Sequence, residues 1–451
     1  MEILKADLDK LFRTIDNLTK EVKSLKKRLS KYENPKNSTN SSIPPSRDEN
    51  RPVKTKSLRT KSNKCVGGQK GHKGHTLKMT KNPDKVIDIF PEHCEKCNQS
   101  LISILPEYLS SRQTIDIPPV KAIYTEYKVY KKTCSCGCQT VSKYPNNVTS
   151  HIGYGENIQS LTAYFHTRQY VPYQRMQELF NTIFNIPISQ AGLHNILDKF
   201  AKKAEPVYDI IRNKIVKSEV VGTDETGARI NNKRGWMWAW QTENLTFIKA
   251  SDNRSARTIL ETFETGLPNS ILVNDHWKPH YKSGAKTHQM CTAHLLRELN
   301  YITELYNKSW SLEFKQLLLD AMELKKRMII SDYYRPNFER NDIISRFEKL
   351  LSLEIDIKYK KMKTFHKRMI DYRGYVFTFL YYHGVPPDNN GSERAMRNIK
   401  VKQKISGQFK NIVNAQNFAI IRSVIDTAIK NGQNIIEALN LISLNNFNLA
   451  E

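Results

Sequence analysis

The chain has 451 residues, too many for one small core, so we expect about two to four domains. Its 71 Lys and Arg exceed its 45 Asp and Glu and give a formal net charge of +26. Such a net positive charge favours a polyanionic partner, most often nucleic acid, although a membrane surface or a ribosome would also attract the protein. No segment approaches the roughly 20 apolar residues of a membrane span, and the first residues lack the apolar region of a signal peptide. We therefore predict a cytoplasmic, nucleoid-associated protein without a membrane partner.

Residues 1–33 have the apolar repeat of a coiled coil. Apolar side chains recur at alternating gaps of four and three, at Leu4, Leu8, Leu11, Ile15, Leu18, Val22, Leu25, Leu29 and Tyr32. β-Branched residues at some a positions with Leu at most d positions favour a parallel two-stranded coil. The alternative is an amphipathic helix that packs on its own domain. We predict a dimerisation helix that supports a homodimer or a higher assembly, and Pro35 ends it.

Residues 34–80 are rich in Asn, Ser, Pro, Gly, Lys and Arg. Few of these residues can offset the entropy of folding, so this stretch is predicted to be a flexible basic linker. It either serves as a solvated connection or makes sequence-independent phosphate contacts, which salt would weaken.

Residues 81–150 hold five of the seven cysteines and are predicted to form a small, β-rich zinc-binding domain. Two cysteine knuckles can supply four thiolates to a tetrahedral Zn²⁺ site, which stabilises a domain too small for its own core. Gly137 suits a knuckle turn, so the favoured ligands are Cys94, Cys97, Cys134 and Cys136, with Cys138 as the substitute for Cys136. Cys65 and Cys291 stand apart, and a lone cysteine is usually a small buried hydrophobe.

Residues 151–217 are predicted to be helical. The segment YQRMQELFNTIFN, a short turn at IPIS and the segment QAGLHNILDKFAKK resemble a helix-turn-helix, with Ser189 placed to cap the second helix. Helix pairs of this shape also occur without DNA contact, so DNA recognition and simple packing both stay open.

Residues 218–430 are predicted to form the catalytic domain. Three strand-like runs, a helix at RSARTILETF and a fourth run at NSILVND follow one another. This order opens a ribonuclease-H-like α/β fold, in which the first and fourth strands are neighbours. Asp224 on the first strand and Asp275 at the end of the fourth would then lie side by side.

A third acid follows after a long gap. Residues 294–382 read as charged helices, so we predict a helical insertion before the last core helix, with residues 431–451 as a C-terminal helix or tail. Glu393 falls in the first turns of that core helix and is preferred over the rivals Glu225 and Asp388. Three converging carboxylates can hold two Mg²⁺ or Mn²⁺ ions about 3.5–4 Å apart, an arrangement that cuts and joins phosphodiesters.

The core helix is also predicted to carry the basic surface next to this site. Lys400 lies seven positions after Glu393 and thus on the same helical face, where it would touch the DNA backbone. The predicted surface is extended by Arg394, Arg397, Lys402 and Lys404.

Over nearly its whole length the chain resembles the insertion-sequence-66 family of bacterial DDE transposases. The resemblance rests on the heptads, the NSSIPPS and GGQKGHKGH segments, the cysteine unit, DETG, CTAHLLREL and VPPDNNGSERAMRNIKVKQKISG. It implies catalytic roles for Asp224, Asp275 and Glu393, a zinc domain before the catalytic domain, and movement of a DNA element by strand transfer. The implied partner is double-stranded DNA, as terminal repeats and target, and a need for accessory transposition proteins stays open.

Two other functions fit the same residues. One is a catalytically silent, zinc-containing DNA-binding protein. The other is a ribonuclease-H-like nuclease or resolvase, which hydrolyses without joining. A less favoured alternative is an RNA-directed enzyme, since the fold also cuts hybrids.

Overall fold

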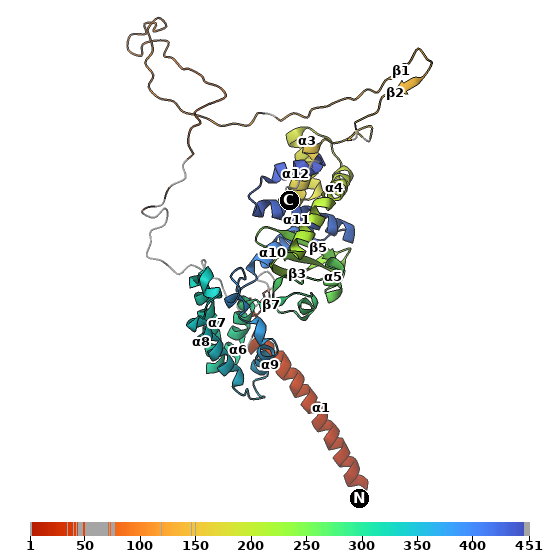
Figure 1. The fold of residues 1–451 in the computed structure, drawn as a ribbon, viewed down its shortest axis with the longest axis vertical. Coiled ribbons are helices and arrows are strands. Elements are labelled where there is room, and N and C mark those ends of the chain that lie inside the picture. Colours follow the sequence, from red (N-terminus) through yellow and green to blue (C-terminus); the bar gives the residue numbers. More distant parts are fainter. Residues whose placement is uncertain are drawn as a thin grey trace. The chain divides into compact units, whose positions relative to one another are not determined.

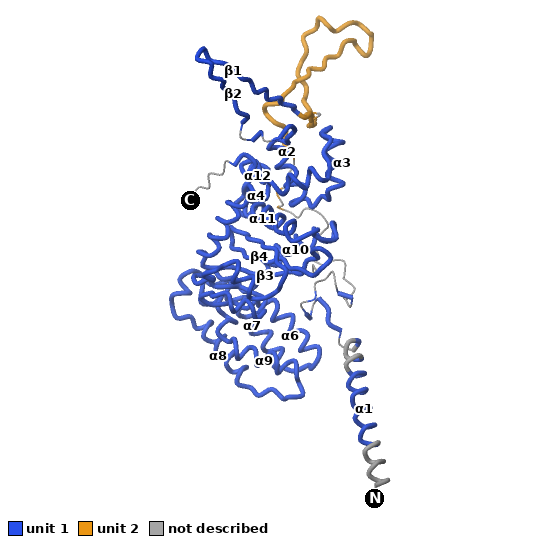
Figure 2. The backbone as a smooth tube through the Cα atoms, turned by 90° about the vertical axis from the view of Figure 1, so that its right-hand side faces the viewer, with its two compact units in different colours: residues 1–52, 123–451 blue, residues 53–122 orange. Residues whose placement is uncertain are grey.

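The computed structural model describes residues 2–33, 35–38, 40, 41, 43, 48, 49, 71, 73, 77–118, 120–145, 147, 148 and 150–445. The chain divides into two compact units, residues 53–122 and residues 1–52 with 123–451 (Figure 2). Most of the predicted basic linker, together with Cys65, lies outside the described residues. Within the described part of the chain, no helix is both long and apolar enough to cross a bilayer.

The N-terminal segment is one long helix, α1, Glu2–Glu33 (Figure 1). Its apolar seam is exposed from Leu11 to Tyr32: Ile15 and Leu18, for example, have 51% and 55% of their surface accessible. The segment is thus helical, and its pairing with a second chain stays a prediction.

Four helical segments lie between residues 150 and 217, directly before the main sheet. They are α2 (Glu156–Ala163), the π-helix η1 (Tyr164–Arg168), α3 (Tyr173–Phe184) and α4 (Gln190–Val216). The predicted helix pair is α3 and α4, and the Ser189 hydroxyl accepts a hydrogen bond from the Gly192 amide at 3.0 Å, as a helix cap should. The C-terminal half of α4 packs against the sheet, where the Tyr208 hydroxyl donates to the Ile248 carbonyl. The helix pair thus shares its core with the domain that follows.

A five-stranded mixed sheet forms the centre of the larger unit (Figure 1). Its strands are β3 (Val220–Ile230), β4 (Lys233–Gln241), β5 (Thr246–Ser251), β6 (Ile271–Asn274) and β7 (Thr287–Met290). They lie in the order β5-β4-β3-β6-β7, antiparallel from β5 to β3 and parallel from β3 to β7. Helix α5 (Ala256–Thr262) and the 3-10 helix η2 (Lys278–Lys282) flank β6 in the sequence. The predicted mixed α/β class is confirmed.

Helices cover the sheet and form two large cores. One core joins the sheet to α4, α11 (Ile412–Lys430) and α12 (Ile435–Ser443). The other joins β6 and β7 to a helical region after β7, which matches the expected insertion. That region comprises α6 (Thr292–Tyr306), α7 (Ser309–Arg327), η3 (Ile330–Tyr333), α8 (Phe338–Ser352), α9 (Lys360–Asp371), η4 (Arg373–Tyr375) and η5 (Thr378–Leu380). Helix α10 (Asn390–Ser406) then returns the chain to β3 and β4.

Candidate active site

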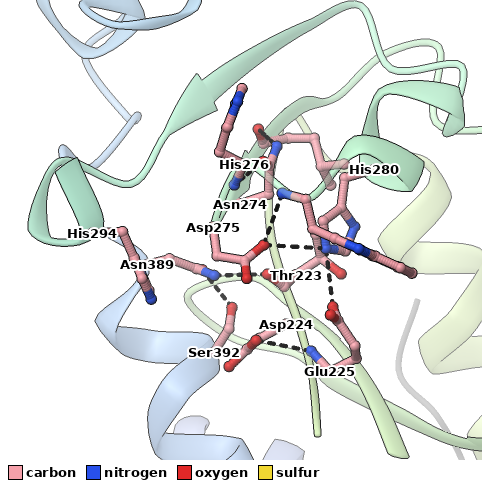
Figure 3. A network of polar contacts seen from close by, with 12 residues as sticks. Thr223, Asp224, Glu225, Asn274, Asp275, His276, His280, His294, Asn389 and Ser392 are labelled. Carbon is pink, nitrogen blue, oxygen red and sulfur yellow. Dashed lines mark hydrogen bonds and ion pairs between the residues drawn. The ribbon is translucent and has the colours of Figure 1, made fainter. Parts of the chain in front are cut away.

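Two of the three predicted acids are neighbours because their strands are paired. Strands β3 and β6 run parallel, and Gly222 pairs with Val273. Asp224 lies two residues further along β3 and Asp275 directly follows the end of β6, and Figure 3 shows their side chains near each other. Both are partly buried. The sheet therefore brings together two carboxylates that are fifty-one positions apart in the sequence.

The third acid, Glu393, lies beside β3 because the start of α10 is fixed to that strand. The side chain of Asn389, which is 3% exposed, donates to the Thr223 carbonyl at 2.7 Å and accepts from the Ser392 hydroxyl at 2.6 Å. A Cβ atom on Gly391 would lie 2.4 Å from the side-chain amide nitrogen of Gln241, so the helix start packs against a side chain of β4 that would have to shift to admit a larger residue. This close docking places the first turn of α10, with Glu393, beside β3.

Neighbouring carboxylates perturb the electrostatics of Asp224. Burial raises the pKa of Asp224 well above its usual range, and the charges of Asp275, Glu225 and Glu393 raise it further. Carboxylates gathered in this way repel one another unless a proton or a cation lies among them. The all-oxygen donor set of Asp224, Asp275 and Glu393 suits Mg²⁺ or Mn²⁺.

Glu393 is surrounded by cationic and imidazole groups. Its Oε1 atom lies 3.5 Å from Nη2 of Arg297 and 3.9 Å from Nε2 of His294, and its Oε2 atom lies 3.9 Å from Nη2 of Arg397. These contacts come from α6 and α10, so the first helix of the insertion forms one wall of the site.

The two rival carboxylates have other partners. Both oxygens of Glu225 are occupied, one by Arg254 and the other by Nε2 of His280 at 3.0 Å. Asp388 accepts from the Asn390 amide at 3.0 Å and so caps the start of α10. Sequence reasoning gave no role at this site to Arg254, His280, His294 or Arg297. His294 and Arg297 lie together in the CTAHLLREL segment on α6, whereas Arg254 and His280 come from other parts of the chain that no spacing links to the acids.

Comparison with known protein families gives two matches. The family model described as Transposase IS66 family matches residues 151–417, which include all three acids. The chain belongs to the IS66 family of transposases. A second model, described as a family of unknown function (DUF6444), matches residues 2–78, and a comparison with curated proteins finds no match.

Helix α10 of this transposase carries much of the predicted basic surface. Arg394, Arg397 and Lys404 are exposed. The ammonium of Lys400 donates a hydrogen bond to the Gly227 carbonyl on β3, so it also fixes α10 to the sheet. Lys402 differs from the prediction, because it is 4% exposed and faces the core rather than the surface.

Burial of Lys402 leads to a stability prediction. Burial lowers the pKa of Lys402 to about 8 from its usual 10.5. Between pH 8 and pH 10.5 the folded state therefore binds fewer protons than the unfolded state. The buried charge destabilises the folded state fully below pH 8, and this cost decreases as the pH rises toward 10.5. We expect Lys402→Met to raise the free energy of unfolding by about 1–3 kcal/mol at pH 7, with a smaller gain at pH 10.

Denaturant unfolding at the two pH values, with exposed Lys404→Met as the control, measures this effect. A destabilised Lys402→Met at pH 7, or a gain that grows with pH, would contradict it. DNA binding should be unchanged by Lys402→Met and weakened by Lys404→Met.

The cysteine knuckles have locally favourable geometry. Backbone amides of Cys97 and Lys96 lower the pKa of the Cys94 thiol, and the Cys136 amide lowers that of Cys134. The second knuckle lies between the short strands β1 (Lys131–Thr133) and β2 (Gln139–Val141), with Gly137 at a φ of 85°. The knuckles belong to different compact units, and the shared zinc site stays a prediction. Cys291 is buried, as expected of a lone cysteine.

Proposed function

We propose that this transposase binds the ends of a DNA element and catalyses metal-dependent strand cleavage and strand transfer at Asp224, Asp275 and Glu393. The proposal rests on the parallel pairing of β3 with β6, which makes Asp224 and Asp275 neighbours, and on the hydrogen bond from Asn389 to Thr223, which fixes the start of α10 and Glu393 beside β3. The charges of Asp275 and Glu393 both raise the pKa of Asp224. The strand order, with β3 central, antiparallel partners on one side and parallel partners on the other, supports a ribonuclease-H-like core.

Asp224, Asp275 and Glu393 would hold the metal pair. When bound, two Mg²⁺ or Mn²⁺ ions would lower the pKa of the attacking hydroxyl and stabilise the negative charge on the leaving oxygen. The chain's residues fix the acids in place: Asn389 holds the start of α10, and Arg297 and His294 contact the Glu393 carboxylate. The exposed cations of α10 lie near the acids, where they can bind the DNA phosphates.

The proposed chemistry needs no covalent enzyme intermediate. Water attacks one phosphodiester and frees a DNA 3′-hydroxyl, and that hydroxyl then attacks a phosphodiester of the target. Each step forms one P–O bond and breaks another, so no oxidant or reductant takes part. Lys400 is proposed to contact the backbone beside the site, since an ammonium has three donors and can bond to Gly227 and a phosphate together.

A joining assay tests this function against both alternatives. Purified protein is incubated in Mg²⁺ with a labelled, pre-cut element end and a supercoiled target plasmid. Covalent transfer of the label to the plasmid is the expected result. Plasmid nicking without transfer would favour the nuclease or resolvase, and binding of the end without either reaction would favour the silent DNA-binding protein.

The exposed seam of α1 is proposed to pair with that of a second chain. We expect Leu18→Asp to shift the protein from dimer to monomer at micromolar concentration, because a charge at a d position opposes the apolar seam. Asn17→Asp adds the same charge off the seam and should leave the dimer intact. Sedimentation analysis measures the assembly, and a dimer that persists in Leu18→Asp would refute pairing through α1.

The four-cysteine site is proposed to hold Zn²⁺ and to order the region around residues 81–150. We expect about one zinc per chain by elemental analysis and near-complete loss in Cys94→Ser. Comparison of Cys136→Ser with Cys138→Ser identifies the fourth ligand, and the prediction is that only Cys136→Ser loses the metal. A metal-free protein purified under zinc-replete, reducing conditions would rule the site out.

A further inference from the structure

We propose that Glu225 and His280 are positioning residues that fix Asp224 and Asp275 for metal binding. This inference rests on the proposed function and adds residues that the three-acid assignment leaves without a role. Figure 3 shows the network of polar contacts that joins them to the two acids.

The first part of the network runs from Glu225 to Asp275. Nε2 of His280 lies 3.0 Å from Oε2 of Glu225 and 3.7 Å from Oδ1 of Asp275. Nε2 lies between two carboxylate oxygens, so the ring's proton belongs on this nitrogen. Asp275 Oδ1 also accepts from the Trp277 amide at 3.1 Å. One oxygen of Asp275 is thereby held by the protein, and the other is left for a cation.

The second part runs through the backbone of Glu225. Its amide donates to Oδ1 of Asp224 at 2.9 Å. One residue therefore contacts both acids: its peptide holds Asp224 directly, and its side chain reaches Asp275 through His280. Outer partners of this kind orient the residues that bind a metal and tune its affinity.

Arg254 completes the network by pairing with the Glu225 carboxylate. Its Nε and Nη2 atoms lie 2.7 and 2.5 Å from Oε1 of Glu225, and its guanidinium stacks over the rings of Trp236 and Trp277. The Glu225 side chain is fully buried, and both of its oxygens face donors. Such a carboxylate is held rigidly and serves as an anchor.

A direct metal ligand role for Glu225 is the competing arrangement. Ligand atoms of Glu225, Asp275 and His280 lie within 4.8 Å of one another, close enough to surround one ion. A cation there would stand near the positive charge of Arg254 and would have to displace the Nε2 proton of His280. The contacts therefore favour the anchoring role.

Glu225→Gln in the full-length protein tests the inference. The glutamine amide retains the shape of the side chain. Its NH₂ group, however, would face Arg254 or His280, which are themselves hydrogen-bond donors. We expect Mn²⁺ affinity, measured by electron paramagnetic resonance with a pre-cut DNA end bound, to fall about 10–100-fold. Strand transfer should fall similarly at low Mn²⁺ and recover in part at high Mn²⁺, with DNA-end binding unchanged.

The matched control is Asp426→Asn. Asp426 forms an ion pair with buried Arg422 at 2.6 Å in the same unit, on α11. Its loss should lower thermal stability without changing Mn²⁺ affinity, which separates a merely structural effect from positioning. If Glu225→Gln does not fold, His280→Gln and His280→Phe are compared instead. Only His280→Gln, which retains a hydrogen-bond donor, should keep part of the wild-type Mn²⁺ affinity.

Two outcomes would overturn the inference. Wild-type Mn²⁺ affinity in Glu225→Gln and in His280→Phe would remove the positioning role. Complete loss of Mn²⁺ binding in Glu225→Gln, equal to that in Asp224→Asn, would make Glu225 a ligand. Strand transfer that persists in Asp224→Asn would instead refute the proposed function, whatever Glu225 does.

Discussion

Asp224→Asn is expected to abolish strand cleavage and strand transfer, with a rate loss of at least about 10³-fold, or roughly 4 kcal/mol of transition-state stabilisation. The substitution keeps the size of the side chain and removes the charge that the metal pair requires. It also removes repulsion from Asp275, Glu225 and Glu393, the charges that raise the Asp224 pKa. Thermal stability should therefore be equal or higher. Gel-shift, thermal unfolding and joining assays on the same preparation measure the three properties.

Asp388→Asn is the matched control for this substitution. Asp388 lies five residues before Glu393, and its carboxylate caps α10 through the Asn390 amide. An asparagine can make the same cap, so activity should stay within a few-fold of wild type. Turnover by Asp224→Asn at the wild-type rate, or loss of activity in Asp388→Asn alone, would contradict the assignment of the acids.

Asn389→Ala is expected to have the second largest effect, because Asn389 connects the two elements that carry Asp224 and Glu393. The substitution leaves the buried Thr223 carbonyl and the Ser392 hydroxyl without their partner. We expect a loss of about 2–3 kcal/mol in the free energy of unfolding, the cost of unsatisfied buried polar groups. A displaced Glu393 should slow strand transfer about 10²-fold, since reacting groups tolerate little misplacement.

Asn390→Ala controls for the change of residue at the start of α10. Asn390 is exposed and its amide still donates to Asp388 after the substitution. Denaturant unfolding and joining rates should both stay near wild type. If Asn389→Ala matched Asn390→Ala in stability and rate, the bond from Asn389 to β3 would not be what holds Glu393 in place.

The neighbouring positions of Asp224 and Asp275 could be predicted because they depend on strand order alone. Short β-branched and aromatic runs indicate strands, and a fourth strand paired with the first brings the two acids together. Glu393 could be predicted from the cap residues before it, since a helix start fixes which residues fall in its first turn. The helix start is a local pattern, whereas the pairing of the first and fourth strands was inferred from the order of the elements.

Lys402 was misplaced because a run of basic residues was taken as one surface. Lys402 follows Ala395 by seven positions and Ile399 by three, which puts it on the buried stripe of α10. Helical periodicity could have found this. The Glu225, His280 and Arg254 network could not be found, because it depends on side-chain contacts between three elements that no sequence spacing encodes.

Anomalous diffraction from Mn²⁺ in crystals of the transposase with a pre-cut DNA end tests the central claim most directly. The account predicts two Mn²⁺ peaks about 3.5–4 Å apart, bound by Asp224, Asp275 and Glu393, with the DNA 3′-hydroxyl beside them. Glu225 should remain bonded to His280 and Arg254. A peak enclosed by Glu225, Asp275 and His280, or DNA-bound protein without Mn²⁺ at the three acids, would contradict the account.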